Sequence, residues 1–145
     1  MSLEKENLKR EISGYNTPEK RKTHHEVFTT EGIILKMLDG YPESAWSNPT
    51  ETWIDPCSGL GNFSVYLIER LMEGLKDWEP NEDLRKKHIL ENMIYHVEMN
   101  PESVEKLQKV LNPEGKYILN VHCGDFLSFA DSISSKNKLS SSPLF

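Results

Sequence analysis

The chain has 145 residues, of which 37% are hydrophobic and 28% charged, so it has the size and composition of one domain that buries its own core. Its net charge of −6 argues against a stand-alone nucleic-acid binder, because such proteins gain much of their affinity by neutralising phosphates. No apolar run approaches the roughly eighteen residues of a membrane span, and the charged start lacks the apolar block of a signal peptide, so we expect a cytoplasmic protein without membrane contact.

Charged side chains dominate residues 1–22. Leu3, Leu8 and Ile12 hint at a short amphipathic helix that Gly14 and Pro18 would stop. The segment as a whole is interpreted as a solvated, partly disordered arm. The basic residues at 20–22 leave an alternative open, in which the arm touches a phosphate backbone.

A helix is predicted after a threonine pair, Thr29 and Thr30, either of which can cap it by accepting hydrogen bonds from its first free amides. The apolar positions of this helix are Ile33, Ile34, Met37 and Leu38. Residues 39–52 are punctuated by proline and glycine and are therefore interpreted as a loop.

The stretch 53–63 is typical of a strand, a tight turn and the start of a helix, because an apolar entry ends in an acid and two glycines follow. Gly59 and Gly61 have no side chain, so a ligand can approach the backbone there, and the free amides at the helix start favour electron-rich groups. Asp55, at the end of the strand, is placed to accept hydrogen bonds from a cationic or hydroxylated ligand. Apolar residues at helical spacing extend the helix to residue 75.

A second strand is predicted over 93–97, after a polar connection and an additional helix that starts near Leu84. Glu98 ends this strand, and a carboxylate in that position of an α/β nucleoside site accepts hydrogen bonds from the two ribose hydroxyls. Pro101 then begins another helix.

A third strand is predicted over 117–123, followed by a turn that contains Asp125 and Phe126. Cys123 in this strand and Cys57 in the glycine turn are too few for a disulfide scaffold or a four-cysteine zinc site. We expect both to be buried thiols beside a pocket, and we assign no metal site.

Four segments together resemble the S-adenosylmethionine-dependent methyltransferases that methylate the N6 amino group of adenine in DNA, as in restriction-modification and phage systems. Motif I of that family closely resembles Asp55-Pro56-Cys57-Ser58-Gly59-Leu60-Gly61-Asn62-Phe63. Motif X resembles the segment 28–32, where this chain has Thr30 in place of the usual proline. Motifs II and III resemble the segments 97–101 and 124–127.

The resemblance implies that S-adenosylmethionine is the cofactor and that these segments form its site. The glycine turn would cradle the methionine part with Asp55 near its amino group, and Glu98 would bind the ribose. The adenine would lie among Met99, Asp125 and Phe126. The residues that the resemblance assigns to the cofactor are Phe28, Thr29, Asp55, Pro56, Gly59, Gly61, Phe63, Glu98, Met99, Asp125 and Phe126.

The resemblance also implies the fold, an incomplete Rossmann-like α/β domain of the class I methyltransferases with parallel strands in the order 3-2-1 and flanking helices. It assigns residues 23–127 to the cofactor-binding half, after the charged arm at 1–22 and before a flexible, serine-rich tail at 128–145.

The family's catalytic signature, Asp/Asn-Pro-Pro-Tyr/Phe, is absent from residues 126–145. We therefore assign no catalytic residue and expect this chain alone to be inactive. DNA would be bound through segments outside this chain. A second copy or a complementing catalytic half would cover the free edge of the first strand.

Three alternatives stay open on the sequence. A fragment of a protein-glutamine or RNA methyltransferase would share the cofactor motifs. A nicotinamide or flavin oxidoreductase would use the related dinucleotide fold, although Ser64 stands where its third glycine is expected. A non-catalytic subunit would use a degenerate methyltransferase domain for assembly.

Overall fold

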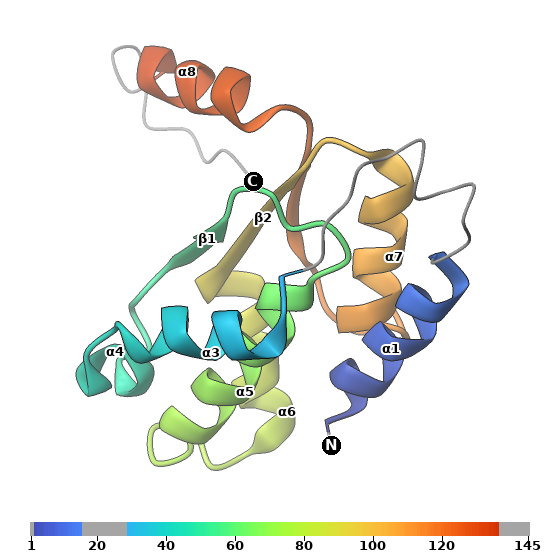
Figure 1. Cartoon of the computed structure of the whole chain (residues 1–145). Coiled ribbons are helices and arrows are strands. Elements are labelled where there is room, and N and C mark those ends of the chain that lie inside the picture. The colour runs from blue at the N-terminus through green and yellow to red at the C-terminus, as the bar shows by residue number, and fades with distance from the viewer. Residues whose placement is uncertain (1, 16–28, 137–145) are drawn as a thin grey trace.

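A three-stranded parallel sheet forms the centre of the protein in a computed structural model that describes residues 2–15 and 29–136 (Figure 1). The strands are β1 (Trp53–Asp55), β2 (Ile94–Glu98) and β3 (Asn120–Cys123), in the order β1-β2-β3. This is the predicted order 3-2-1 read from the opposite edge, and it confirms a mixed α/β architecture with a parallel sheet. Because all three strands run the same way, their carboxyl ends meet at one edge of the sheet.

Helices pack against this sheet and bury much of its apolar surface. They are α1 (Leu3–Tyr15), α3 (Glu31–Asp39), α4 (Glu43–Ser47), α5 (Asn62–Gly74), α6 (Glu82–His88), α7 (Pro101–Leu111) and α8 (Phe126–Lys136). Helices α3 and α4 pack against α5, and α1 packs against α7. The fully buried core includes Ile34, Leu38, Leu60, Leu71, Ile89, Ile94, Leu107 and Leu111. In Figure 1, α8 projects beyond the carboxyl ends of the strands.

The N-terminal segment forms the helix at which Leu3, Leu8 and Ile12 had hinted, but this helix packs on the core and is not part of a solvated arm. Leu8 of α1 is buried in the core, and the half-buried Lys86 forms an ion pair with the buried Glu4. The charges of α1 therefore find partners on the protein surface while its apolar side is buried. Residues 16–22, with the basic cluster at 20–22, lie outside the described part of the chain.

Two helices occupy segments that the sequence had indicated to be irregular. Helix α4 forms within the expected loop and buries Trp46, whose ring stacks on Trp53 at a centroid distance of 5.0 Å. Helix α8 covers the first part of the expected flexible tail, and Phe129 anchors it by packing on the His122 ring at 4.4 Å. Residues 137–145 lie outside the described residues.

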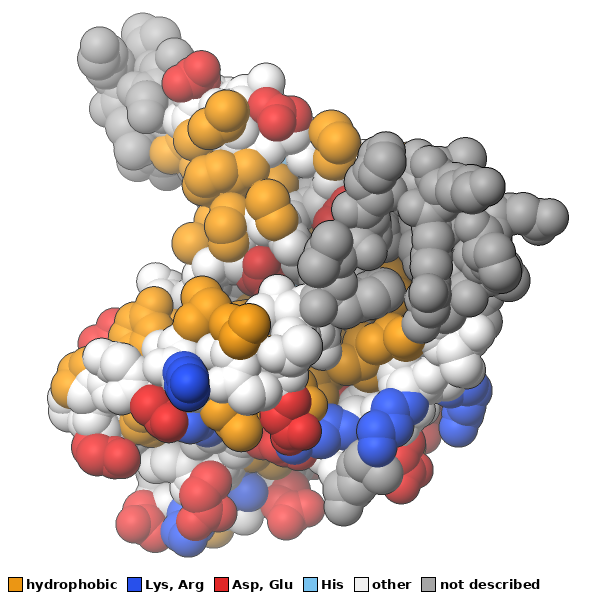
Figure 2. Space-filling model, viewed as in Figure 1, with side chains coloured by type: hydrophobic (Ala, Val, Ile, Leu, Met, Phe, Trp, Pro, Cys, Tyr) orange, Lys and Arg blue, Asp and Glu red, His pale blue; other side chains and the backbone are white. Residues whose placement is uncertain are grey.

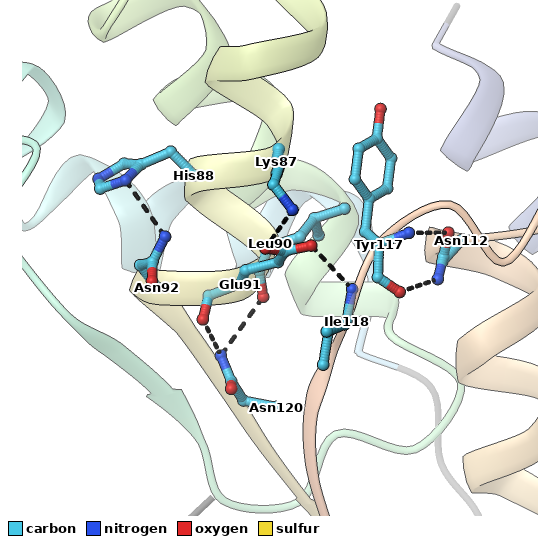
Figure 3. A network of polar contacts seen from close by, with 9 residues as sticks. All are labelled: Lys87, His88, Leu90, Glu91, Asn92, Asn112, Tyr117, Ile118 and Asn120. Atoms are coloured by element: carbon cyan, nitrogen blue, oxygen red, sulfur yellow. Dashed lines mark hydrogen bonds and ion pairs between the residues drawn. The ribbon is translucent and has the colours of Figure 1, made fainter.

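A π-helical turn, η1 (Ile89–Met93), leads from α6 into β2. Such a turn leaves backbone carbonyls without their usual partners. The Asn120 side-chain amide donates to two of them, at 2.9 Å from Glu91 O and 3.4 Å from Leu90 O (Figure 3). It also lies 3.2 Å from Ile94 O, at the start of β2. The Glu91 carboxylate in turn accepts from Ile118 N at 3.0 Å. These contacts fix the start of β3 at Asn120, three residues later than predicted.

Neither a bilayer-spanning helix nor a metal cluster occurs in the described ranges. No helix there combines the length and apolar character needed to cross a membrane. No three His, Cys, Asp or Glu side chains in residues 2–15 and 29–136 are grouped to hold a metal ion. Cys57 and Cys123 are both exposed, so the expectation of buried thiols was wrong. Cys57 lies in the turn after β1 and Cys123 is the last residue of β3, where the chain leaves the sheet.

Candidate functional site

A cavity of about 290 Å³ lies at the carboxyl end of β1, beside the glycine turn. Five of the predicted cofactor residues line it, namely Thr29, Asp55, Pro56, Gly59 and Phe63. Met37, Cys57, Ser58, Leu60 and Asn62 complete the lining. The motif I turn and Thr29, which lies two residues before α3, therefore line the same cavity, as the sequence predicts for two segments of one site.

A hydrogen bond joins these two segments directly. The Asn62 side-chain amide at the start of α5 donates to the backbone carbonyl of Thr29. Thr30, the residue before α3, makes no capping bond with its side chain, so the capping role proposed for the threonine pair is not seen. Phe28, the other motif X residue, lies outside the described residues.

The two glycines of the turn have different surroundings. Both have positive φ, +50° at Gly59 and +87° at Gly61, which disfavours any residue with a side chain. A Cβ atom added to Gly59 would meet no atom within 4 Å, whereas one added to Gly61 would lie 2.6 Å from Leu107 Cδ1. Gly59 thus leaves the cavity open, and Gly61 lets α5 approach α7.

Glu98 is tied to the glycine turn by its carboxylate. Its Oε2 accepts from Gly59 N at 2.7 Å, and its Oε1 accepts from Asn100 N at 2.8 Å. Each oxygen keeps lone pairs for a further donor, since a carboxylate can accept about four hydrogen bonds. The acid that ends β2 is therefore held in a fixed orientation next to the cavity and remains able to accept from hydroxyl groups.

Asp55 has an electrostatic environment that suits a cationic ligand. Burial raises the pKa of its carboxyl group, a backbone hydrogen bond from Cys57 N at 3.3 Å opposes that rise, and the negative charge of Glu98 adds to it. A positively charged group placed near both acids would relieve their repulsion and favour the ionised form of Asp55.

The remaining predicted contacts do not line this cavity. Met99 is 71% exposed. The Asp125 carboxylate begins α8 and accepts from Ser128 N and Ser128 Oγ, both at 2.9 Å, and these bonds lower its pKa. Phe126 is half-buried in the first turn of α8. Of the three strand-end acids, the structure brings Asp55 and Glu98 together, while Asp125 serves as a helix cap.

A second cavity of about 500 Å³ adjoins the first and shares Met37, Asp55, Pro56 and Phe63 with it. It continues along the outer side of β1, where Tyr41, Trp53 and Ile54 make it largely apolar. Figure 2 shows the surface hollowed beneath α8, with apolar side chains gathered on both sides of the hollow. The sequence indicated Met37 as one of the apolar positions of its helix and did not indicate that it lines both cavities. In the structure Met37 is 54% exposed.

Comparison with known proteins adds one partial similarity. No protein-family model matches the chain. Over 75 residues it is 40% identical to a protein of Mycoplasma pneumoniae that is described as an uncharacterized adenine-specific methylase. The matched stretch is 50% of this chain and 18% of that protein, so the chain spans less than a fifth of the relative's length.

Proposed function

We propose that this chain is the cofactor-binding portion of an S-adenosylmethionine-dependent methyltransferase that acts on the N6 amino group of adenine in DNA. The 40% identity to an adenine-specific methylase supports a methyltransferase of this kind. The observation that carries the cofactor assignment is the arrangement of two acids at the open glycine turn, with Asp55 lining the cavity and Glu98 bound to the amide of Gly59, which also lines it.

The residues present fit this cofactor by their chemistry. Burial raises the pKa of Asp55, and the negative charge of Glu98 raises it further, so a cation close to both acids would be stabilised; the cofactor carries an amino group and a sulfonium. Asp55 would hold the amino group, and the free lone pairs of Glu98 would accept from the ribose hydroxyls. The open space above Gly59 leaves room for the methionine part.

S-adenosylmethionine supplies an activated methyl group, so the protein has to bind and orient the two reactants and exclude water. The residues of this chain would bind and orient one of the two reactants, the cofactor. Residues 126–145 contain no Asp/Asn-Pro-Pro-Tyr/Phe sequence, and we therefore propose that the adenine, extruded from its helix, is held by segments outside this chain.

Isothermal titration calorimetry tests the proposal directly. We expect the chain to bind S-adenosylmethionine and S-adenosylhomocysteine with one site per chain, and not to bind nicotinamide dinucleotide. Binding should also raise the melting temperature, because a ligand at about 100 times its Kd stabilises the native state by about 2.7 kcal/mol. Binding of the dinucleotide in preference would identify an oxidoreductase instead.

We further propose that the free edge of β1 is covered by the complementing catalytic half of the enzyme. Within the described residues β1 pairs only with β2, and Ile54 on it is 50% exposed beside the apolar second cavity. An uncovered edge of this kind invites pairing with another chain. The length of the relative leaves room for such a half.

Without that half, the isolated chain should self-associate through β1. Sedimentation velocity at high micromolar concentration should show dimers that the Ile54→Lys variant lacks, because a charge on this strand disfavours edge pairing. Ile118→Lys is the matched control, since Ile118 is 74% exposed and precedes the opposite edge strand, β3. A wild-type chain that stays monomeric would contradict this proposal.

A further inference from the structure

A side chain of the glycine turn holds the part of the cavity wall that Thr29 forms. Asn62 is the first residue of α5, and its side-chain amide donates to the backbone carbonyl of Thr29. Both residues line the cavity beside the glycine turn. Because a carbonyl oxygen only accepts hydrogen bonds, the nitrogen of the Asn62 amide is the atom that faces it. The bond therefore ties two walls of one cavity to each other.

The hydrophobic core holds helix α3 but not the residues that come directly before it. Ile34 and Leu38 of α3 are fully buried, whereas Thr29 and Thr30 are exposed. The Thr30 side chain makes no capping bond, and its backbone is extended, with φ −70° and ψ 151°. In the described part of the chain, the bond from Asn62 is the one hydrogen bond that Thr29 makes. It fixes a stretch of backbone that the packing of the core leaves free.

A second contact joins α5 to α3 at a distance from this cavity. Arg70 of α5 forms an ion pair with Asp39, the last residue of α3. Neither residue lines the cavity beside the glycine turn or the apolar cavity that adjoins it. Helix α5 thus holds the α3 segment at both of its ends, once at the cavity wall and once outside it. Comparing the two contacts separates the general packing of α3 on α5 from an effect on a ligand.

We propose that Asn62 is a positioning residue for the cofactor, which acts through Thr29. Its amide holds the Thr29 backbone at the cavity in the free protein, so that the ligand does not have to order this segment when it binds. The inference rests on the proposed function, because it assigns this cavity to the methionine part of S-adenosylmethionine. The role of Asn62 therefore concerns the methionine part and not the ribose, which is assigned to Glu98.

Calorimetry with two ligands tests this role. 5′-Methylthioadenosine is a nucleoside that lacks the amino-acid end of S-adenosylmethionine and leaves the space beside Thr29 empty. Asn62→Ala should weaken binding of S-adenosylmethionine about tenfold, because the ligand would then have to fix the backbone of one further residue. Binding of 5′-methylthioadenosine should be unchanged. Equal weakening of both ligands would indicate a general loss of structure and would overturn the proposal.

Arg70→Ala is the matched control, because it removes the other contact between α5 and the α3 segment without changing the cavity. Its affinity for S-adenosylmethionine should equal that of the wild type. If Arg70→Ala weakens binding as much as Asn62→Ala does, the packing of α3 as a whole sets the affinity, and Asn62 has no positioning role of its own.

Amide hydrogen exchange tests the contact without any ligand. Ile33 N and Ile34 N both donate to Thr30 O at the start of α3, at 3.0 and 3.1 Å. Asn62→Ala should speed exchange at these two amides, because the backbone that precedes them is released. Val65 N lies in the first turn of α5 and should exchange as in the wild type. Unchanged exchange at Ile33 and Ile34 would overturn the inference whether or not the chain binds the cofactor.

Failure of the proposed function and failure of this inference give different results. A wild-type chain that binds neither ligand would contradict the proposed function, and hydrogen exchange would still report whether Asn62 holds the Thr29 segment. A wild-type chain that binds S-adenosylmethionine no more tightly than Asn62→Ala would keep the proposed function and overturn the positioning role.

Discussion

Replacing Gly61 with alanine should lower the free energy of unfolding by about 2–5 kcal/mol. Part of this loss, about 1–2 kcal/mol, comes from forcing a side chain into left-handed backbone at φ +87°. The rest, about 1–3 kcal/mol, comes from overpacking, because the new Cβ would lie 2.6 Å from Leu107 Cδ1 in the contact between α5 and α7. Urea unfolding followed by circular dichroism measures the change.

Gly59→Ala is the matched control, because it changes the same turn without a steric clash. Its cost should stay near the backbone term of about 1–2 kcal/mol, since a Cβ there meets no atom within 4 Å. The added methyl group would instead point into open space beside the cavity and weaken cofactor binding. If Gly61→Ala proves no more destabilising than Gly59→Ala, the close approach of α5 and α7 at this turn is wrong.

The sequence predicted the elements whose local signals agree with their packing. The strand that ends at Asp55, the helix after the glycine turn, the strand that ends at Glu98 and the helix that begins at Pro101 all form within one or two residues of their expected bounds. Each has a period of apolar residues and a clear stop or start signal. Such segments need little information from the rest of the chain.

The elements that were missed depend on tertiary contacts. The sequence hinted at helix α1 but did not reveal its packing, which comes from the ion pair with Lys86 and the burial of Leu8 against distant segments. Helix α8 was hidden in a serine-rich stretch because its anchor, the packing of Phe129 on His122, joins residues of different elements. Neither contact can be inferred from spacing along one segment.

The candidate site shows the same division. The resemblance to the family's motifs predicted that Thr29 and the motif I turn belong to one site, and in the structure they line the same cavity. It could not reveal that the Glu98 carboxylate binds the Gly59 amide, nor that Asp125 is occupied as the cap of α8. Both facts concern where a carboxylate points, which the surrounding backbone determines. Nor could the resemblance reveal that Ser64, which stands where a third glycine was expected, has its hydroxyl 2.9 Å from Nε2 of the buried His96.

Replacing Glu98 with alanine should weaken binding of S-adenosylmethionine by about 100-fold. Two charge-assisted hydrogen bonds to the ribose would be lost, and about 1.5 kcal/mol or more for each amounts to that factor. The Gly59 and Asn100 amides would also lose their acceptor, which loosens the turn that forms the cavity. Calorimetry on the variant measures the affinity, and urea unfolding measures the accompanying loss of stability.

The pattern across ligands makes this prediction specific. Glu98→Ala should weaken binding of 5′-methylthioadenosine, a nucleoside without the amino-acid end, as strongly as binding of S-adenosylmethionine, because both ligands carry the ribose. Glu105→Gln is the control, since Glu105 is an exposed acid on α7 outside both cavities, and it should change neither affinity. If Glu98→Ala spares the nucleoside and weakens only the full cofactor, the ligand lies in the opposite orientation, with its amino group at Glu98 and its ribose at Asp55.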